Sequence, residues 1–267
     1  MRISSLSRKW MVCTVLFPIL SCAWLIPAWA QEGTTDQAAQ GPTATVSTDF
    51  LSQYIFRGVA NTANGAVMQP SLTLGYQGIS VNIWGNADLS TKTDGRQKWT
   101  ETDVTASYTR EVIKDFSLTA GMTHYFLPTA NFDATEIFGG GSYNFPWLTV
   151  GFTAYREVSY YPGWWFELDF SKSIPLPYYG MSLDLAASFG YLILDNDNNA
   201  LNQTFSDPGA GQILVDLKIP IGKIFSISPK VGVSFPLSTA ESHYLEASSV
   251  DNQDTHVFGG VNITAAW

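Results

Sequence analysis

The chain has 267 residues, of which 14 are lysine or arginine and 23 are aspartate or glutamate, so its formal net charge is −9. A chain this acidic is a poor candidate for nucleic acid, and we expect no nucleic-acid partner. No stretch beyond residue 30 approaches the roughly 18 uninterrupted apolar residues of a membrane-spanning helix, so residence in a membrane would have to come from strands.

Residues 1–30 have the features of a secretory signal peptide. A basic stretch, "RKW", precedes an apolar run at residues 11–26, and the small-x-small sequence "AWA" ends at Ala30. This order of features predicts export and cleavage after Ala30, while an uncleaved membrane anchor and acylation at Cys22 are weaker alternatives. Both cysteines of the chain lie inside this leader, so we expect no disulfide bond in the exported protein.

Residues 31–43 are small, polar and aperiodic, and we interpret them as a flexible N-terminal tail. Residues 44–267 divide into segments with strand-like alternation, separated by turn-forming residues, and no segment of useful length has helical periodicity. Most segments have 10 to 14 residues, whereas soluble strands usually have about five or six and tilted strands that cross a bilayer need about nine to eleven. The predicted strands are 45–58, 68–77, 79–90, 99–110, 115–127, 134–144, 147–160, 163–173, 181–194, 211–220, 225–235 and 255–267.

Hairpin registers test this alternation. A two-residue turn at Gln77 and Gly78 would pair apolar residues with apolar residues on the two flanking strands. A turn centred on Pro162 would also keep the faces consistent, and it would place Glu157 directly opposite Glu167, where like charges destabilise a sheet. The register of the sixth strand, around "FGGGSYN", stays open at this stage.

The connections between the predicted strands alternate between long and short, as in outer-membrane barrels with extracellular loops and short periplasmic turns. Aromatic residues gather at strand ends, and the last strand ends at Trp267, similar to the terminal aromatic that bacterial barrels present to their assembly machinery. We therefore predict an all-β fold over residues 44–267: a closed up-and-down antiparallel transmembrane β-barrel of about 12 strands. A soluble sandwich or a lipocalin-like barrel with its apolar face inward is the alternative.

This architecture predicts a location and partners. We expect the protein in the outer membrane of a Gram-negative bacterium, with outer-membrane lipids around it and the barrel assembly machinery as a transient partner. In the first predicted strand, alternation would turn Phe50, Tyr54 and Phe56 toward lipid and Asp49 and Arg57 toward a polar interior.

The stretch "STDFLSQYIFRGVANT" resembles the opening strand of the TorF-type porin family, bacterial exported proteins that were formerly a family of unknown function. The residues that match the family motif are Ser52, Tyr54, Phe56, Arg57, Gly58 and Thr62. Ala60 and Asn61 stand where the family more often has serine and glutamine. The resemblance is specific only in this strand, and it implies an outer-membrane barrel with porin-like transport.

Charged residues in the predicted strands fall mainly on the inward face. The inward acids are Asp49, Asp88, Glu101, Asp103, Glu157, Glu167, Asp169, Asp184 and Asp216, and the inward bases are Arg57, Lys218 and Lys230. Polar lumina commonly hold charged side chains, so these residues could form a hydrated and largely neutralised network. Alternatively, the excess of acids could form a constriction that attracts cations.

The motifs of enzymes and metal sites do not occur in this chain. No histidine is followed two residues later by serine, no histidines are paired at metal-ligand spacing, and no glycine-rich phosphate loop follows a strand. We therefore expect no enzymatic activity, no cofactor and no metal. The predicted function is a passive channel for small hydrophilic solutes, mildly cation-preferring, and the alternative is a closed structural barrel that acts through its extracellular loops.

Overall fold

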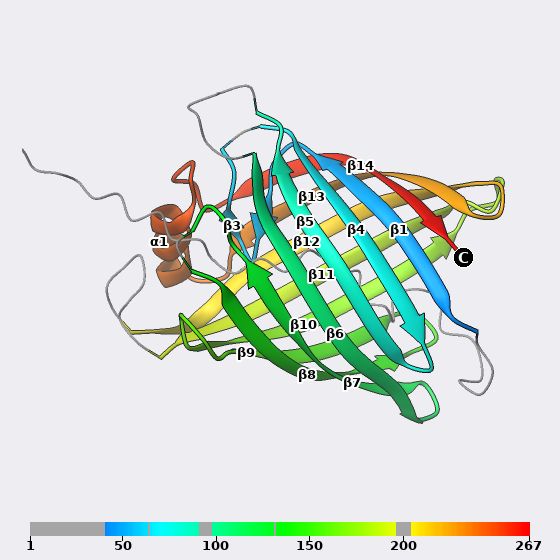
Figure 1. The fold of residues 1–267 in the computed structure, drawn as a ribbon, viewed down its shortest axis with the longest axis horizontal. Helices are drawn as coiled ribbons and strands as arrows, with labels where there is room; N and C mark the ends of the chain where they lie inside the picture. Colours follow the sequence, from blue (N-terminus) through cyan, green and yellow to red (C-terminus); the bar gives the residue numbers. More distant parts are fainter. Residues whose placement is uncertain (1–40, 64, 91–97, 131, 196–203) are drawn as a thin grey trace, which may run out of the picture.

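The computed structural model describes residues 41–63, 65–90, 98–130, 132–195 and 204–267, and its strands close into a barrel (Figure 1). Twelve strands pair antiparallel with their neighbours, and β1 closes the barrel against β14, so the predicted fold class is confirmed. The barrel strands are β1 (Thr43–Leu51), β4 (Val67–Tyr76), β5 (Ile79–Asp88), β6 (Trp99–Ile113), β7 (Phe116–Phe126), β8 (Ala134–Asn144), β9 (Thr149–Glu157), β10 (Gly163–Pro175), β11 (Ser182–Leu194), β12 (Phe205–Ile221), β13 (Phe225–Pro236) and β14 (His256–Ala266). The predicted signal peptide and most of the predicted tail lie outside the described residues.

The wall has its apolar face outside and its polar face inside. On β5, Val81 and Ile83 are 39% and 46% exposed, whereas Asn82 between them is 4% exposed. Asn82 donates to the hydroxyl groups of Ser71 and Thr73 on the inner face of β4, both over 2.8 Å. Because a closed sheet pairs every strand with two neighbours, such a wall meets the requirement that backbone groups be satisfied inside a bilayer.

The β4–β5 turn follows the predicted register. Gln77 and Gly78 have φ angles of 49° and 84°, the left-handed conformations of a two-residue type I′ turn, and Leu74 pairs with Val81.

The predicted register of the β9–β10 hairpin is wrong. Glu167 pairs with Thr153, and Glu157 pairs with Gly163, so the two glutamates are not opposed. The connection is longer than predicted because Oε1 of Glu157 accepts hydrogen bonds from the backbone N–H groups of Ser159 and Tyr160, which curls the chain out of the ladder. The register differs by an even number of residues, so each side chain still keeps its predicted face.

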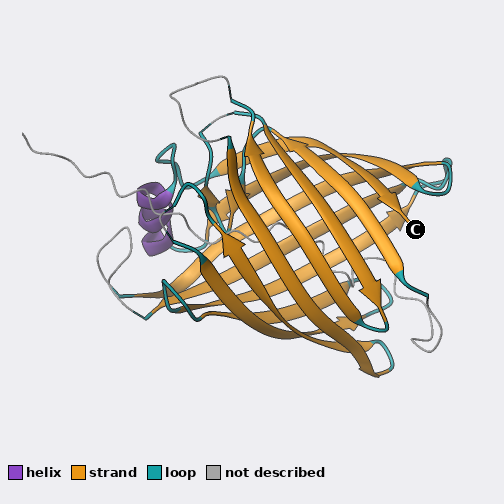
Figure 2. Cartoon of the chain, viewed as in Figure 1, coloured by secondary structure: helices purple, strands orange, loops and turns teal. Residues whose placement is uncertain are grey.

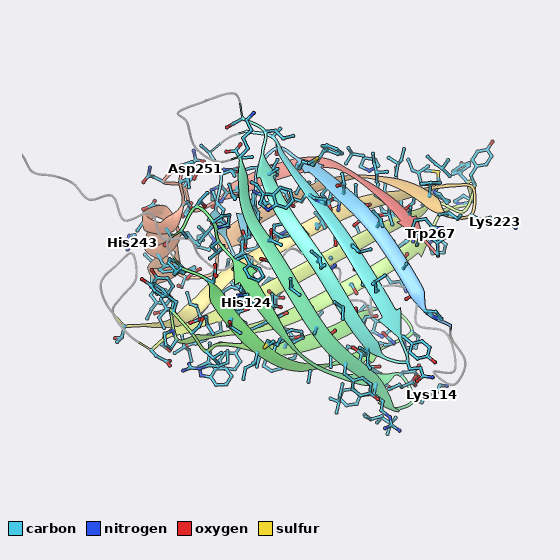
Figure 3. All side chains as sticks on the ribbon, viewed as in Figure 1. Lys114, His124, Lys223, His243, Asp251 and Trp267 are labelled. Carbon is cyan, nitrogen blue, oxygen red and sulfur yellow. The ribbon has the colours of Figure 1, made fainter. Side chains whose placement is uncertain are left out.

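The two ends of the barrel differ in the length of their connections. One end, here called the turn end, carries the short turns, and Figure 3 shows Lys114, Lys223 and Trp267 there. The other end, the loop end, carries the longer connections, with His243 and Asp251 (Figure 3). At the turn end the N–H of Trp267 donates to the backbone O of Ala44, which joins the C-terminus to the first strand.

A helix that the sequence analysis did not predict lies at the loop end. Helix α1 (Thr239–Ser248) connects β13 to β14 and is the one helix among the described residues (Figure 2). It begins because the Ser238 hydroxyl accepts a hydrogen bond from the backbone N–H of Glu241, the serine half of a capping box. Among the described residues, no helix is both long enough and apolar enough to span a membrane.

Candidate functional site: an inward hairpin in an acidic lumen

The first barrel strand ends earlier than predicted, and the chain then turns into the barrel. Ser52 is the last residue that continues the pairing of β1 with β14. Its N–H donates to the backbone O of Gly259, and its hydroxyl accepts from the Gly259 N–H. Beyond it, Tyr54 and Phe56 are only 3% and 2% exposed. The prediction that these two aromatic side chains face lipid is therefore wrong, because they leave the wall and pack inside it.

The inward segment is a short β-hairpin, formed by β2 (Ile55–Phe56) and β3 (Val59–Ala60). Arg57 and Gly58 form its tip, with φ angles of 44° and 89° that again correspond to a type I′ turn. A Cβ atom on Gly58 would lie 2.6 Å from Cβ of Ala210 on the wall, so glycine is required here for space as well as for conformation.

The hairpin crosses the lumen. Tyr54 and Phe56 pack with residues of β4, β5, β7 and β8, including Trp84 and Tyr125. Val59 packs against β10, β12 and α1, on the opposite side of the barrel. The remaining apolar residues of the hairpin pack against β12 and β14. These contacts fill the half of the interior nearest the loop end, here called the loop half, with the chain's own side chains. The half nearest the turn end is called the turn half.

Arg57 at the tip of the hairpin is the centre of a polar and aromatic cage. Its Nη1 lies 2.7 Å from Oε1 of Glu136, and its Nη2 lies 3.1 Å from Oε2, which makes a bidentate ion pair. The Tyr125 hydroxyl donates to Oε2 of Glu136 over 2.8 Å and thereby orients the carboxylate. The guanidinium carbon also lies 4.8 Å from the ring centroid of Tyr155 and 5.1 Å from that of Trp165, distances typical of cation–π contacts.

The position of the Trp165 ring depends on two glycines. A Cβ atom on Gly190 would lie 2.1 Å from the ring, and one on Gly209 would lie 2.6 Å from it. The missing side chains therefore leave the space in which the indole ring lies against the neighbouring strands. Nε1 of Trp165 also donates to Glu167 over 3.0 Å, which fixes the ring's orientation.

Further carboxylates surround the tip. Glu167 lies within electrostatic range of both Arg57 and Glu136, and Asp169 follows it on the same inner face of β10. On β6, two strands away from β8, Asp103 lies within electrostatic range of Glu136. The inward acids near the tip are Glu101, Asp103, Glu136, Glu157, Glu167 and Asp169.

A second charged group lies on the inner face of β1, β12 and β13. Nζ of Lys230 is 2.8 Å from Oδ1 of Asp49 and 3.5 Å from Oδ2 of Asp216. Asp184 pairs with Asp216 across β11 and β12 and accepts a hydrogen bond from Ser173. Elsewhere the turn half is lined mainly by small polar side chains: Ser47, Ser71, Thr73, Asn82, Ser107, Thr109, Thr119, Ser142, Thr153, Ser171, Ser226, Ser228 and Thr264.

The other predicted site residues lie apart from the tip. Asp88 is at the loop end of β5, where its carboxylate accepts from the N–H of Ser90. Lys218 follows Asp216 on the inner face of β12, and Trp267 is 60% exposed at the turn end.

Glu136 is a site residue that the sequence did not predict, because its pattern does not fix the register of the sixth strand. The sequence signal for it is the adjacent apolar residue Ile137, since alternation places the two side chains on opposite faces. In the structure Ile137 is 49% exposed on the outer face.

The histidines form no evident catalytic group. His256 contacts the carboxylate of Asp251 through Nε2, and Nδ1 of His124 contacts the hydroxyl of Thr135. Within the described residues, neither imidazole contacts both a carboxylate and a serine or threonine hydroxyl. Those residues also contain no group of three or more His, Cys, Asp or Glu side chains placed to hold a metal ion.

A bacterial family described as "Bacterial protein of unknown function (Gcw_chp)" has a sequence model that matches residues 35–232. Two solved porins have similar folds at low identity. The KdgM porin has a TM-score of 0.51 and 10% identity, over 84% of this chain and 99% of that chain. The NanC porin has a TM-score of 0.52 and 11% identity, over 84% of this chain and 98% of that chain. The COG4313 outer membrane channel from Pseudomonas putida F1 has a TM-score of 0.48 at 10% identity, over 89% of this chain and 100% of that chain. None of the curated proteins compared with the chain matches it. At these identities the structural likeness shows the fold alone.

Proposed function

The chain belongs to the Gcw_chp family of bacterial proteins, and from the barrel it forms we propose that it is a porin-type channel of the outer membrane for small hydrophilic solutes. The assignment to the TorF-type porins, which rests on the motif of the opening strand, is part of this proposal. So is the absence of enzymatic activity.

The observation that carries the proposal is the inverted wall. Aliphatic side chains such as Val81 and Ile83 are exposed on the outside, while the hydroxyls and amides of the turn half line the inside. A water-soluble barrel would bury its apolar face inward. A polar lumen within an apolar belt favours a water-filled passage through a membrane, with the loop end extracellular and the turn end periplasmic.

The inward hairpin makes this a gated channel in our proposal. Because the hairpin and α1 occupy the loop half of the barrel, solutes pass when the hairpin shifts away from one side of the wall. The strands of the hairpin pair only with each other and form a separate two-stranded sheet, which favours motion as a unit. The resting conductance should therefore be small and intermittent.

The lumen charge supports a preference for cations. The interior around the tip holds six inward acids and one guanidinium, and on the other side Lys230 is shared between Asp49 and Asp216. A ring of excess carboxylates lowers the energy of a cation in a pore and raises that of an anion.

Planar-bilayer recordings test the proposal with two proteins. In the first, residues 53–62 are replaced by a short glycine-serine linker, and we expect a large, steady conductance. In the wild type we expect rarer and smaller steps that reverse at a cation-selective potential in a salt gradient. A linker variant that folds and inserts but does not conduct would contradict the channel.

A closed barrel that acts through its loops is the second candidate, and the hairpin that crosses the lumen favours it. The same recordings separate the two functions. A silent wild type beside a conducting linker variant would show that the refolded protein inserts correctly and that the native barrel is closed. Steps in the wild type itself would exclude the closed barrel.

A further inference from the structure

We propose that the cage around Arg57 is a binding site for solutes that carry a guanidinium group, and that the hairpin occupies this site in the closed barrel with a guanidinium of its own. The proposal rests on the channel function and deepens it, because it names a class of solute.

The cage has the geometry of a guanidinium site. A planar guanidinium is recognised by a carboxylate that accepts two parallel hydrogen bonds and by aromatic faces that stack on it. Glu136 supplies the first contact, over 2.7 and 3.1 Å, and the rings of Tyr155 and Trp165 supply the second. These three residues belong to the barrel wall, on β8, β9 and β10, so the site remains when the hairpin leaves.

The supporting contacts also belong to the wall. Tyr125 on β7 donates to Glu136, and Trp165 donates to Glu167 while its ring fills the space beside Gly190. The cage is therefore preorganised by residues that do not move with the hairpin.

The cage holds more acidic side chains than a structural latch requires. One carboxylate would be enough to anchor one arginine, yet Glu167 lies within electrostatic range of the same guanidinium. Glu157 is the cross-strand neighbour of Glu136 on β9 and is 4% exposed. Among the described residues, Oε2 of Glu157 has no hydrogen-bond partner, although the side chain is more than nine-tenths buried. A buried carboxylate oxygen without a donor is costly, and a site that also receives cations from solution explains it better than a permanent latch.

The sequence of the turn at the tip also supports a guanidinium site. A type I′ turn favours asparagine, aspartate or glycine at the position of Arg57, because a left-handed φ of 44° brings the Cβ atom of most other residues too close to the backbone. The turn therefore carries its arginine against its backbone preference, and the contacts of the side chain in the cage offset that cost. The hairpin in this respect resembles a tethered solute.

Calorimetric titration of the detergent-solubilised Arg57→Ala variant with guanidinium chloride, at constant ionic strength, tests the site without measuring conductance. We expect saturable binding at about 1 mM or tighter, accompanied by a change in tryptophan fluorescence from Trp165. In the wild type the tethered guanidinium fills the cage, so binding should be absent at the same concentrations. Arg110→Ala, which removes an exposed arginine of β6, is the matched control and should behave as the wild type.

A second substitution identifies the cage. Adding Glu136→Gln to Arg57→Ala should weaken guanidinium binding by about tenfold or more, because a charge-assisted bidentate contact is lost. If Arg57→Ala does not fold, as judged by heat-modifiable gel mobility, the linker variant of residues 53–62 also empties the cage and takes its place.

Four results would decide between these possibilities. No saturable binding in the emptied barrel would overturn the site, and equal binding of methylammonium would overturn the assignment to guanidinium. Binding to a barrel that never conducts would refute the channel and leave the site standing, whereas conductance without binding would refute the site alone.

Discussion

Gln53 and Asp251 are 198 positions apart in the sequence, yet Nε2 of Gln53 donates a hydrogen bond to Oδ2 of Asp251 over 2.8 Å. The contact joins Gln53, which precedes the inward hairpin and is here called its neck, to the segment that follows α1. Backbone contacts run beside it, because the N–H of Val250 donates to the O of Ala60 and the N–H of Ala60 donates to the hydroxyl of Ser249. The hairpin and the β13–β14 connection are thus held together at the loop end.

The first prediction follows from this contact. Asp251→Ala removes the acceptor of Gln53 and also the partner of His256, which Asp251 contacts over 3.2 Å. We expect the hairpin to be released more often, with an increase of about tenfold or more in the open-to-closed ratio in bilayer recordings, because a hydrogen bond to a charged group contributes about 1.5–3 kcal/mol. Glu246→Ala is the control, since Glu246 is an exposed acid on α1. An unchanged open probability for Asp251→Ala would show that the neck is not the latch.

The second prediction concerns the tip. Gly58→Ala would place a methyl group 2.6 Å from Ala210 and 2.9 Å from Leu245, and would also strain a residue whose φ is 89°. We expect the hairpin to dock less well by about 1–3 kcal/mol, seen as a larger steady conductance. Gly222→Ala is the control for a strained alanine outside the hairpin, because Gly222 also has a positive φ, 71°, but no atom lies within 4 Å of its added Cβ. Similar conductance changes in both variants would show that the effect does not come from the docking of the hairpin.

The strands and their faces could be predicted from sequence because an apolar outer face and a polar inner face impose a period of two on every strand. The hairpin could not be predicted in this way. Tyr54 and Phe56 continue the outward phase of β1, and an apolar side chain that packs inside a plug looks the same in sequence as one that faces lipid. The available sequence signal was Gly58, since a glycine inside a strand pattern often marks a bulge or a close approach of the backbone.

Loop geometry and long-range contacts account for the other differences. The β9–β10 connection is lengthened by local hydrogen bonds to Glu157. The alternation of apolar and polar residues in the sequence does not indicate such hydrogen bonds. Helix α1 is short and weakly amphipathic, and its one sequence signal is the serine-to-glutamate spacing from Ser238 to Glu241. The pairing of Arg57 with Glu136 depends on where the hairpin crosses the barrel, which only the closed structure shows.

The third prediction addresses ion selectivity in the turn half. Asp184→Asn together with Asp216→Asn removes two neighbouring inward carboxylates and leaves Lys230 paired with Asp49. We expect the reversal potential in a salt gradient to move toward that of a non-selective pore, because the excess negative charge falls. These positions serve better than Glu157, whose carboxylate holds the β9–β10 loop. Lys230→Met is the opposite control and should strengthen cation preference, and an unchanged potential in the double variant would place selectivity at the tip.

The last prediction is a pH dependence of the docking of α1. Glu241 is fully buried, and among the described residues neither of its carboxylate oxygens has a hydrogen-bond partner. Burial, with a smaller contribution from the nearby charge of Asp207, raises the pKa of Glu241 from 4.5 to about 8. Burial likewise raises the pKa of Tyr244, its neighbour on α1, so the tyrosine stays neutral across the range in which Glu241 titrates.

The direction of the pH dependence of docking follows from the raised pKa of Glu241. Docked α1 keeps a proton on Glu241 that undocked α1 releases, so the stabilising effect of this group is complete below about pH 4.5 and is lost as the pH rises to about 8. Between these values, docking should weaken by about 1.4 kcal/mol per pH unit. Hydrogen exchange of the α1 amides, corrected for the intrinsic pH dependence of exchange, measures this slope. Glu241→Gln should abolish it while Glu246→Gln keeps it, and a flat profile in the wild type would show that Glu241 is already ionised when α1 is docked.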